Sequence, residues 1–140
     1  MKKIIFLSIT ALALIIASCK KKSNSDTTVD PRVPPDMAFK TGVNYTSSNI
    51  TATRLDTLLI GVVVTKTEDN LTSFNASYSY DGSSTTTSFF NHHLSSNEYS
   101  GYSVDLPYYT RNQAGTEVLT FTIVDRDGNI TTKSITITVP

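Results

Sequence analysis

The chain has 140 residues, with twelve basic and twelve acidic side chains, so its formal net charge is zero. Residues 36–140 carry six basic residues and ten carboxylates, and this net charge of −4 leaves no basic patch for nucleic acid. The single cysteine excludes an internal disulfide, and residues 36–140 have the usual size of one domain.

The chain begins with the layout of a secretion signal. Lys2 and Lys3 precede an apolar run over residues 4–17, which only Ser8 and Thr10 interrupt. As a helix this run extends about 21 Å, which is less than the roughly 30 Å of a membrane's hydrocarbon core. A positive start, an apolar middle and small residues at the end are typical of a signal peptide. We therefore predict a signal peptide over residues 1–18.

The only cysteine, Cys19, stands at the end of this run, directly after Ile16, Ala17 and Ser18. These four residues resemble the lipobox of bacterial lipoproteins. The resemblance implies cleavage before Cys19 and acylation of both its thiol and its new amino group. Several acyl chains bury enough methylene groups for durable anchoring, whereas one chain does not. In the alternative interpretation, the signal is an ordinary one and Cys19 is incidental.

Residues 19–35 are predicted to be a lipidated cysteine followed by a flexible tether, because they are polar and contain three prolines. With its lysines and acyl anchor, this segment resembles Bacteroidota-type outer-membrane lipoproteins. The resemblance implies a lipid anchor in the outer membrane, on either the cell-surface or the periplasmic face. Asp26-Thr27-Thr28 resembles the O-glycosylation motif of that group, which makes Thr27 a candidate site; Asp56-Thr57-Leu58 is a second match.

Residues 36–140 are rich in β-branched, aromatic and turn-forming residues and read as a series of strands. Apolar residues alternate over 57–65, where the second face is also apolar and predicts a central strand. Further strands are expected over 71–80, closed by Asp81-Gly82, and over 102–106. Residues 119–139 predict a hairpin turning at Asp127-Gly128. Weaker candidates are residues 38–45, 49–54 and 86–92.

About seven short strands separated by turns predict an all-β protein, an immunoglobulin-like antiparallel β-sandwich over residues 36–140. The stretch from 114 to 139 also resembles the last two strands of bacterial immunoglobulin-like and PKD-like domains. The residues that carry this resemblance are Gly115, Phe121, Val124, Asp125, Gly128 and Asn129. The resemblance implies the fold and says almost nothing about function.

Few residues suggest chemistry. His92 and His93 are adjacent, so a regular strand would point them to opposite faces, and no metal-binding spacing surrounds them. Asp125, Asp127 and Asn129 have the spacing of the first ligands in a calcium-binding loop. Ile130 occupies the position at which that loop needs glycine, so we favour a hairpin turn as the explanation of these residues. No nucleophile motif is present. We therefore expect a protein that is not an enzyme and that uses neither a metal nor a cofactor.

Aromatic residues are concentrated in residues 89–109, which we call the aromatic segment, and they give the main functional hint. Aromatic rings stack on sugars and anchor protein interfaces, although some of these rings are expected in the core. Tyr108 and Tyr109 must face opposite ways in a strand, so at least one should be exposed. The candidate ligand-binding residues are Phe89, Phe90, Tyr99, Tyr108 and Tyr109.

These observations predict a lipid-anchored, non-catalytic binding or assembly module of the outer membrane or cell surface. It would meet a protein partner through a sheet edge or through the aromatic segment. The alternative is a glycan-binding accessory lipoprotein of a polysaccharide-uptake system, in which Tyr99, Tyr108 and Tyr109 would be the stacking platforms.

Overall fold

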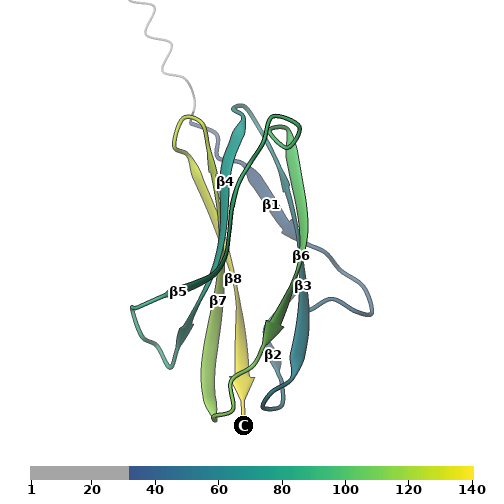
Figure 1. The fold of residues 1–140 in the computed structure, drawn as a ribbon, viewed down its shortest axis with the longest axis vertical. Coiled ribbons are helices and arrows are strands. Elements are labelled where there is room, and N and C mark those ends of the chain that lie inside the picture. The colour runs from purple at the N-terminus through teal and green to yellow at the C-terminus, as the bar shows by residue number, and fades with distance from the viewer. Residues whose placement is uncertain (1–31) are drawn as a thin grey trace, which may run out of the picture. The chain divides into compact units, whose positions relative to one another are not determined.

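The structure is a computed structural model that describes residues 32–140 (Figure 1). Cys19 and Thr27 lie outside the described residues. Eight strands follow one another in these described residues: β1 (Asp36–Phe39), β2 (Ile50–Thr51), β3 (Thr57–Thr65), β4 (Leu71–Tyr80), β5 (Thr87–His93), β6 (Gly101–Tyr109), β7 (Gly115–Asp125) and β8 (Ile130–Val139). None of the described residues forms a helix, so this part of the chain offers no helix that could cross a membrane.

The strands form two sheets that pack face to face as a sandwich (Figure 1). One sheet has the order β1-β3-β6, and the other has the order β2-β8-β7-β4-β5. In immunoglobulin sandwiches, strands A, B and E are likewise separated from G, F, C and, in variable domains, C′. The predicted all-β, immunoglobulin-like sandwich is therefore confirmed, with eight strands instead of about seven. One detail of the antiparallel prediction is wrong, because the short β2 runs parallel to β8.

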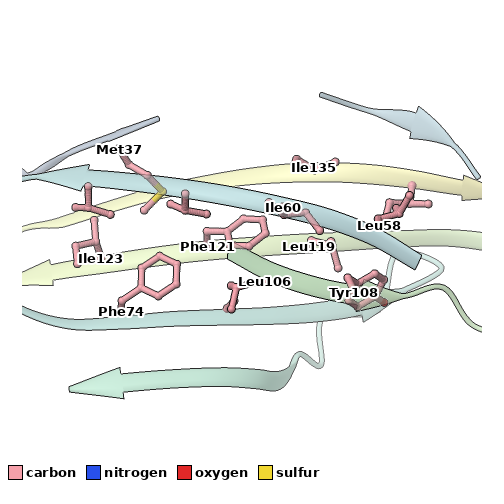
Figure 2. Packing of buried hydrophobic residues seen from close by; sticks show 14 of the residues in the cluster. Met37, Leu58, Ile60, Phe74, Leu106, Tyr108, Leu119, Phe121, Ile123 and Ile135 are labelled. Atoms are coloured by element: carbon pink, nitrogen blue, oxygen red, sulfur yellow. The ribbon is translucent and has the colours of Figure 1, made fainter. Parts of the chain in front are cut away.

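The core follows from the alternation of side chains along the strands. On β3, Leu58, Ile60, Val62 and Val64 all point inward and are buried. The same is true of Leu119, Phe121 and Ile123 on β7 and of Ile135, Ile137 and Val139 on β8. Each such side chain contributes about 1.5–3 kcal/mol when it leaves water. Figure 2 shows Leu58, Ile60, Leu119, Phe121, Ile123 and Ile135 meeting between the two sheets. β3 has the central position in its sheet that its two apolar faces predicted.

The turn between β7 and β8 explains the calcium-like spacing as a structural motif. The Asp125 carboxylate accepts hydrogen bonds from the backbone N–H of Asp127 at 3.0 Å and of Asn129 at 2.8 Å. Its other oxygen accepts from the Asn129 side chain at 2.9 Å. Gly128 has φ +84°, a conformation that glycine adopts without strain. The predicted hairpin is confirmed, and Asp125 organises its turn.

The described chain enters the sandwich at the end where β3 turns into β4 and β7 turns into β8 (Figure 1). The Thr67 hydroxyl donates to the backbone oxygens of Val33 and Pro34, and the Thr131 hydroxyl donates to that of Pro35. Residues 33–35 are therefore fastened to this end of the domain before β1 begins.

Candidate functional site

The aromatic residues that the sequence singled out lie mainly along the side of the sandwich between β5 and β6. We call this group the aromatic seam: Phe89, Phe90 and His92 on β5, with Tyr102 and Tyr108 on β6. Because β5 and β6 belong to different sheets, the seam closes one side of the sandwich. His92 stacks on Tyr102 at a centroid distance of 5.0 Å, and Phe89 lies 5.4 Å from Tyr108.

A bulge in β5 turns two consecutive phenylalanines toward the core. The pairing of β4 with β5 shifts between Ala76 and Ser77, so Phe90 pairs with Ala76 while Ser88 pairs with Ser77. Phe89 is the extra residue, which lets both rings pack against buried residues. The Asn75 amide supports the bulge by donating to the Ser88 hydroxyl at 2.7 Å and to the Phe90 carbonyl at 3.2 Å.

The structure corrects the expectation that Tyr108 is a ligand platform. Its side chain is only 5% exposed, and Figure 2 shows the ring among core residues such as Leu58, Leu106 and Leu119. The reason is the phase of β6: Leu106 and Tyr108 share the inward face, whereas Tyr109 points outward and is 68% exposed. Tyr99, Phe89 and Phe90 are half-buried and pack against the core.

The hydroxyl of Tyr108 binds a buried carboxyl group that sequence reasoning missed. Glu117 on β7 is 0% exposed, and its Oε2 accepts the Tyr108 hydroxyl at 2.6 Å. Its Oε1 accepts the backbone N–H of Arg111 at 2.9 Å. Burial, followed by the hydrogen bond to Glu117, raises the pKa of Tyr108 above its ordinary value. The sequence held the signal, because Glu117 is in phase with Leu119, Phe121 and Ile123.

Arg111 extends this buried group to the end of the β4 strand. Its Nε lies 3.7 Å from Glu117 Oε1, and its Nη2 donates to both oxygens of Asp81 at 2.6 and 2.7 Å. The guanidinium also lies over the Tyr80 ring at 4.6 Å. The hydrogen bond from Arg111 lowers the pKa of Asp81 below its ordinary range. These groups bind one another and form a structural network.

His92 and His93 face opposite sides of β5, as predicted. His92 Nε2 lies 3.1 Å from Glu98 Oε1, whereas His93 is exposed. Hydrogen bonds from the hydroxyl and the backbone N–H of Ser95 come first among the causes that lower the pKa of Glu98 to about 2. The His92 contact adds to them. Within residues 32–140 no three His, Cys, Asp or Glu side chains are grouped so that they could hold a metal ion.

Exposed apolar side chains occur on the outer side of the three-stranded sheet and in the loops that adjoin it. Tyr109 pairs with Thr57, and the next pair along the two strands on the same outer face is Leu59 with Pro107. The large exposed residues of this sheet and its adjoining loops are Val43, Leu55, Val63 and Tyr109. We call these four residues the apolar face, although only Val63 and Tyr109 belong to strands and Val43 and Leu55 lie in loops. Between Val63 and Tyr109, Lys40 binds Asp105 at 2.6 Å and lays its stem over Gly61, where a Cβ atom would meet Lys40 carbons at 2.6–2.8 Å.

The outer side of the five-stranded sheet is different, because hydroxyl and amide groups occupy most of its outward positions, with Val118, Val124 and Ile130 as the apolar exceptions on β7 and β8. One row across the strands is Ser77, Thr120 and Ser134, and the next is Asn75, Thr122 and Thr132. In the described chain, the outward positions of β4, β5, β7 and β8 carry no Asp, Glu, Lys or Arg. At its β2 edge lies a shallow groove of about 280 Å³, lined by Asn49, Ile50, Thr51, Thr136 and Thr138.

Comparisons with known proteins assign this chain to no family. No family model and no curated protein matches the chain. Among solved structures, one of murine CRIg is similar over 77% of this chain and 99% of that chain, with 12% identity and a TM-score of 0.43. A similarity this distant carries no functional argument.

The adjacent tyrosines of β6 give a matched test of the buried network. In Tyr108→Phe, a buried Glu117 oxygen loses its partner, so the free energy of unfolding should fall by about 1–3 kcal/mol. Tyr109→Phe removes an exposed hydroxyl and should change it by less than about 0.5 kcal/mol. Urea-induced unfolding followed by circular dichroism measures both. Equal effects would contradict a structural role for the Tyr108–Glu117 bond.

The Glu98 contacts predict a pH dependence. Because folding lowers the pKa of Glu98 from an ordinary 4.5 to about 2, its stabilising effect is complete above pH 4.5 and disappears as the pH falls through about 2. Glu98→Gln should therefore unfold at lower urea than the native chain at pH 7, and the difference should shrink between pH 4.5 and pH 2. A difference that stays constant across this range would show that the Glu98 charge is unimportant.

Proposed function

We propose that this chain is a non-catalytic binding or assembly module that acyl chains on Cys19 hold in the outer membrane. The sequence Ile16-Ala17-Ser18-Cys19, with the only cysteine directly after an apolar run, supports the anchor. The sandwich supports the module, since its described ionisable pairs tie loops and strands together: Arg111 with Asp81, His92 with Glu98, and Lys40 with Asp105.

The observation that carries the binding role is the apolar face. Val43 is fully exposed, and Leu55 and Tyr109 are each about two-thirds exposed. Folding therefore removes little of their apolar surface from water. Burying them against another protein would contribute about 25 cal/mol for each Å² of apolar surface. Tyrosine is also enriched among the residues that dominate interface energies. A protein partner is therefore the ligand that we assign to this face.

Two substitutions test the two halves of this proposal. Cys19→Ser should move the chain from the membrane fraction to the soluble fraction and abolish the acyl mass on the mature protein; the control Ser18→Ala keeps a small residue and should not. Tyr109→Ser should reduce, several-fold, the protein recovered with the acylated chain from cross-linked membranes, whereas Thr122→Ser on the opposite sheet should not. An unchanged membrane fraction contradicts the anchor, and unchanged recovery contradicts the apolar face.

A second candidate function, binding of a neutral glycan, is favoured by the polar outer side of the five-stranded sheet. The groove at β2 offers threonine hydroxyls, an asparagine amide and one isoleucine, which match the mixed polar and apolar character of a sugar ring. Since the surrounding outward positions carry no charge, the ligand would be uncharged. This site replaces the tyrosine platforms that the sequence predicted, because Tyr108 is buried.

Migration in gels that contain a neutral polysaccharide, such as glucomannan, tests this candidate. The full mature chain with Cys19→Ser should be retarded, and Thr138→Val should reduce the retardation because it removes a groove hydroxyl without changing the side-chain shape. Thr120→Val lies on the same face outside the groove and is the matched control. Equal migration with and without neutral polysaccharides would contradict glycan binding, as would equal effects of the two substitutions.

A further inference from the structure

The sandwich has four edge strands, and each one exposes backbone groups that could pair with another chain. β1 and β6 bound the three-stranded sheet, while β2 and β5 bound the five-stranded sheet. Proteins usually protect such edges with charged side chains, with proline, with a β-bulge, or by keeping the edge strand very short. Comparing the four edges shows which of them has the least protection.

Three of the edges are protected. β1 has four residues, starts with Asp36 and follows two prolines. β6 carries Asp105 and Pro107, and proline at an edge removes one donor that an added strand would use. β2 has two residues, and the part of β8 that it leaves uncovered carries the exposed Lys133. Lys133 pairs with the buried Phe121 of β7, so its charge lies on the inward side of β8. A charge at such a position discourages a further strand from adding there.

β5 is the least protected edge, because the bulge at Phe89 is its only such device. Its seven residues, Thr87–His93, include no acidic residue, no lysine or arginine and no proline. The segment that follows does not cover this edge, because it crosses the end of the sandwich: Leu94 donates to Thr72 O, while Tyr99 O accepts from Leu71. The chain then passes directly into β6 of the other sheet. The outer edge of β5 is therefore open over the regular part of the strand beyond the bulge, residues 90–93.

We infer that β5 is a self-association edge, at which the β5 of a second copy of this chain adds in antiparallel orientation across a two-fold axis. In a two-fold interface the same residues meet from both sides. Like charges placed opposite each other across two strands are destabilising, so a self-pairing strand must be uncharged. β5 meets this condition, whereas β6, with Asp105, does not.

The outward side chains of β5 also suit their own copies. Asn91 and His93 point to the same outer face as Asn75 and Ser73, with which they pair. An asparagine amide carries both donors and an acceptor, so it can bond to an identical amide without a complementary partner. A charged segment from another protein would find no opposite charge on this strand. The strand's neutrality therefore favours the second copy over an acidic or basic partner.

The membrane anchor would strengthen this association, and this step rests on the proposed function. One added strand of seven residues buries less than the roughly 1,200–2,000 Å² of a stable interface, so pairing in solution should be weak. Anchoring confines the copies to one surface and raises their effective concentration. Residues 33–35, the last residues of the predicted tether, are fixed to one end of each domain. If the two-fold axis is normal to the membrane, residues 33–35 of both copies lie at the same distance from the membrane surface.

Cysteine cross-linking in native membranes tests the proposal with the full acylated chain. Acylation uses the Cys19 thiol, so an introduced cysteine is the only free one. Asn91→Cys and His93→Cys place it on β5, and Ser134→Cys places it on the same outer face three strands away. After mild oxidation, at least one β5 variant should form several-fold more disulfide-linked dimer than Ser134→Cys. Equal dimer fractions at all three positions, or no dimer at all, would overturn self-association through β5.

A charge introduced into β5 gives the second arm. Asn91→Lys, added to His93→Cys, should reduce the dimer fraction several-fold because it brings like charges together, whereas Ser134→Lys should leave it unchanged. Circular dichroism confirms that both lysine variants fold. A reduction by both, or by neither, would overturn the proposal, and so would cross-links from β5 to a different protein only.

The failure of the anchor is recognised separately. If Cys19 is not acylated, the mass of the mature chain lacks the acyl groups. Its free thiol would then also form disulfide-linked dimers in the chain that has no introduced cysteine. In that case the Cys19→Ser chain carries the test, in an analytical ultracentrifuge at increasing concentration. A dimer that Asn91→Lys weakens there would support the β5 edge even if the membrane anchor is wrong. A monomer at every concentration would overturn it.

Discussion

The buried carboxyl group of Glu117 is the constraint on which the arrangement of both sheets depends. It lies on β7 of the five-stranded sheet and accepts the hydroxyl of Tyr108 from β6 of the three-stranded sheet. A carboxyl group this deeply buried is destabilising unless its oxygens have partners, so Tyr108 and Arg111 must stay beside it. The contact fixes the phase of both strands. Phe121 then points into the core, and Tyr109 points into solvent.

β5 and β6 are edge strands of different sheets, and no described strand bridges them. This gap determines where the aromatic side chains of residues 89–109 pack. Without such a strand, the side of the sandwich is closed by side chains, and Phe89, Phe90, Tyr102 and Tyr108 fill it together with His92. A cluster that looks like a binding site in the sequence therefore completes the core. What remains for recognition is the exterior: an apolar face on one sheet and an uncharged polar face with an open edge on the other.

Alternation predicted those parts of the fold in which each strand specifies its own phase, such as β3 with Ile60 and the β7–β8 hairpin with Gly128. The phase of β6 could also be read, because Leu106 places Tyr108 inside. The bulge at Phe89 could not, since one extra residue reverses the face of everything beyond it. The open edge of β5 was equally hidden, because the order of strands in a sheet depends on contacts that no single strand encodes.

The two proposed surfaces have a geometric relation that follows from pairing through β5. A two-fold axis between antiparallel strands stands perpendicular to their sheet, so a dimer would continue the five-stranded sheet and keep both three-stranded sheets on one side of it. Both copies of Tyr109 would then face the same direction. Two weak contacts to one partner act together when geometry allows both, which raises avidity without any new contact. Self-association would thus make a small apolar face an effective binding surface.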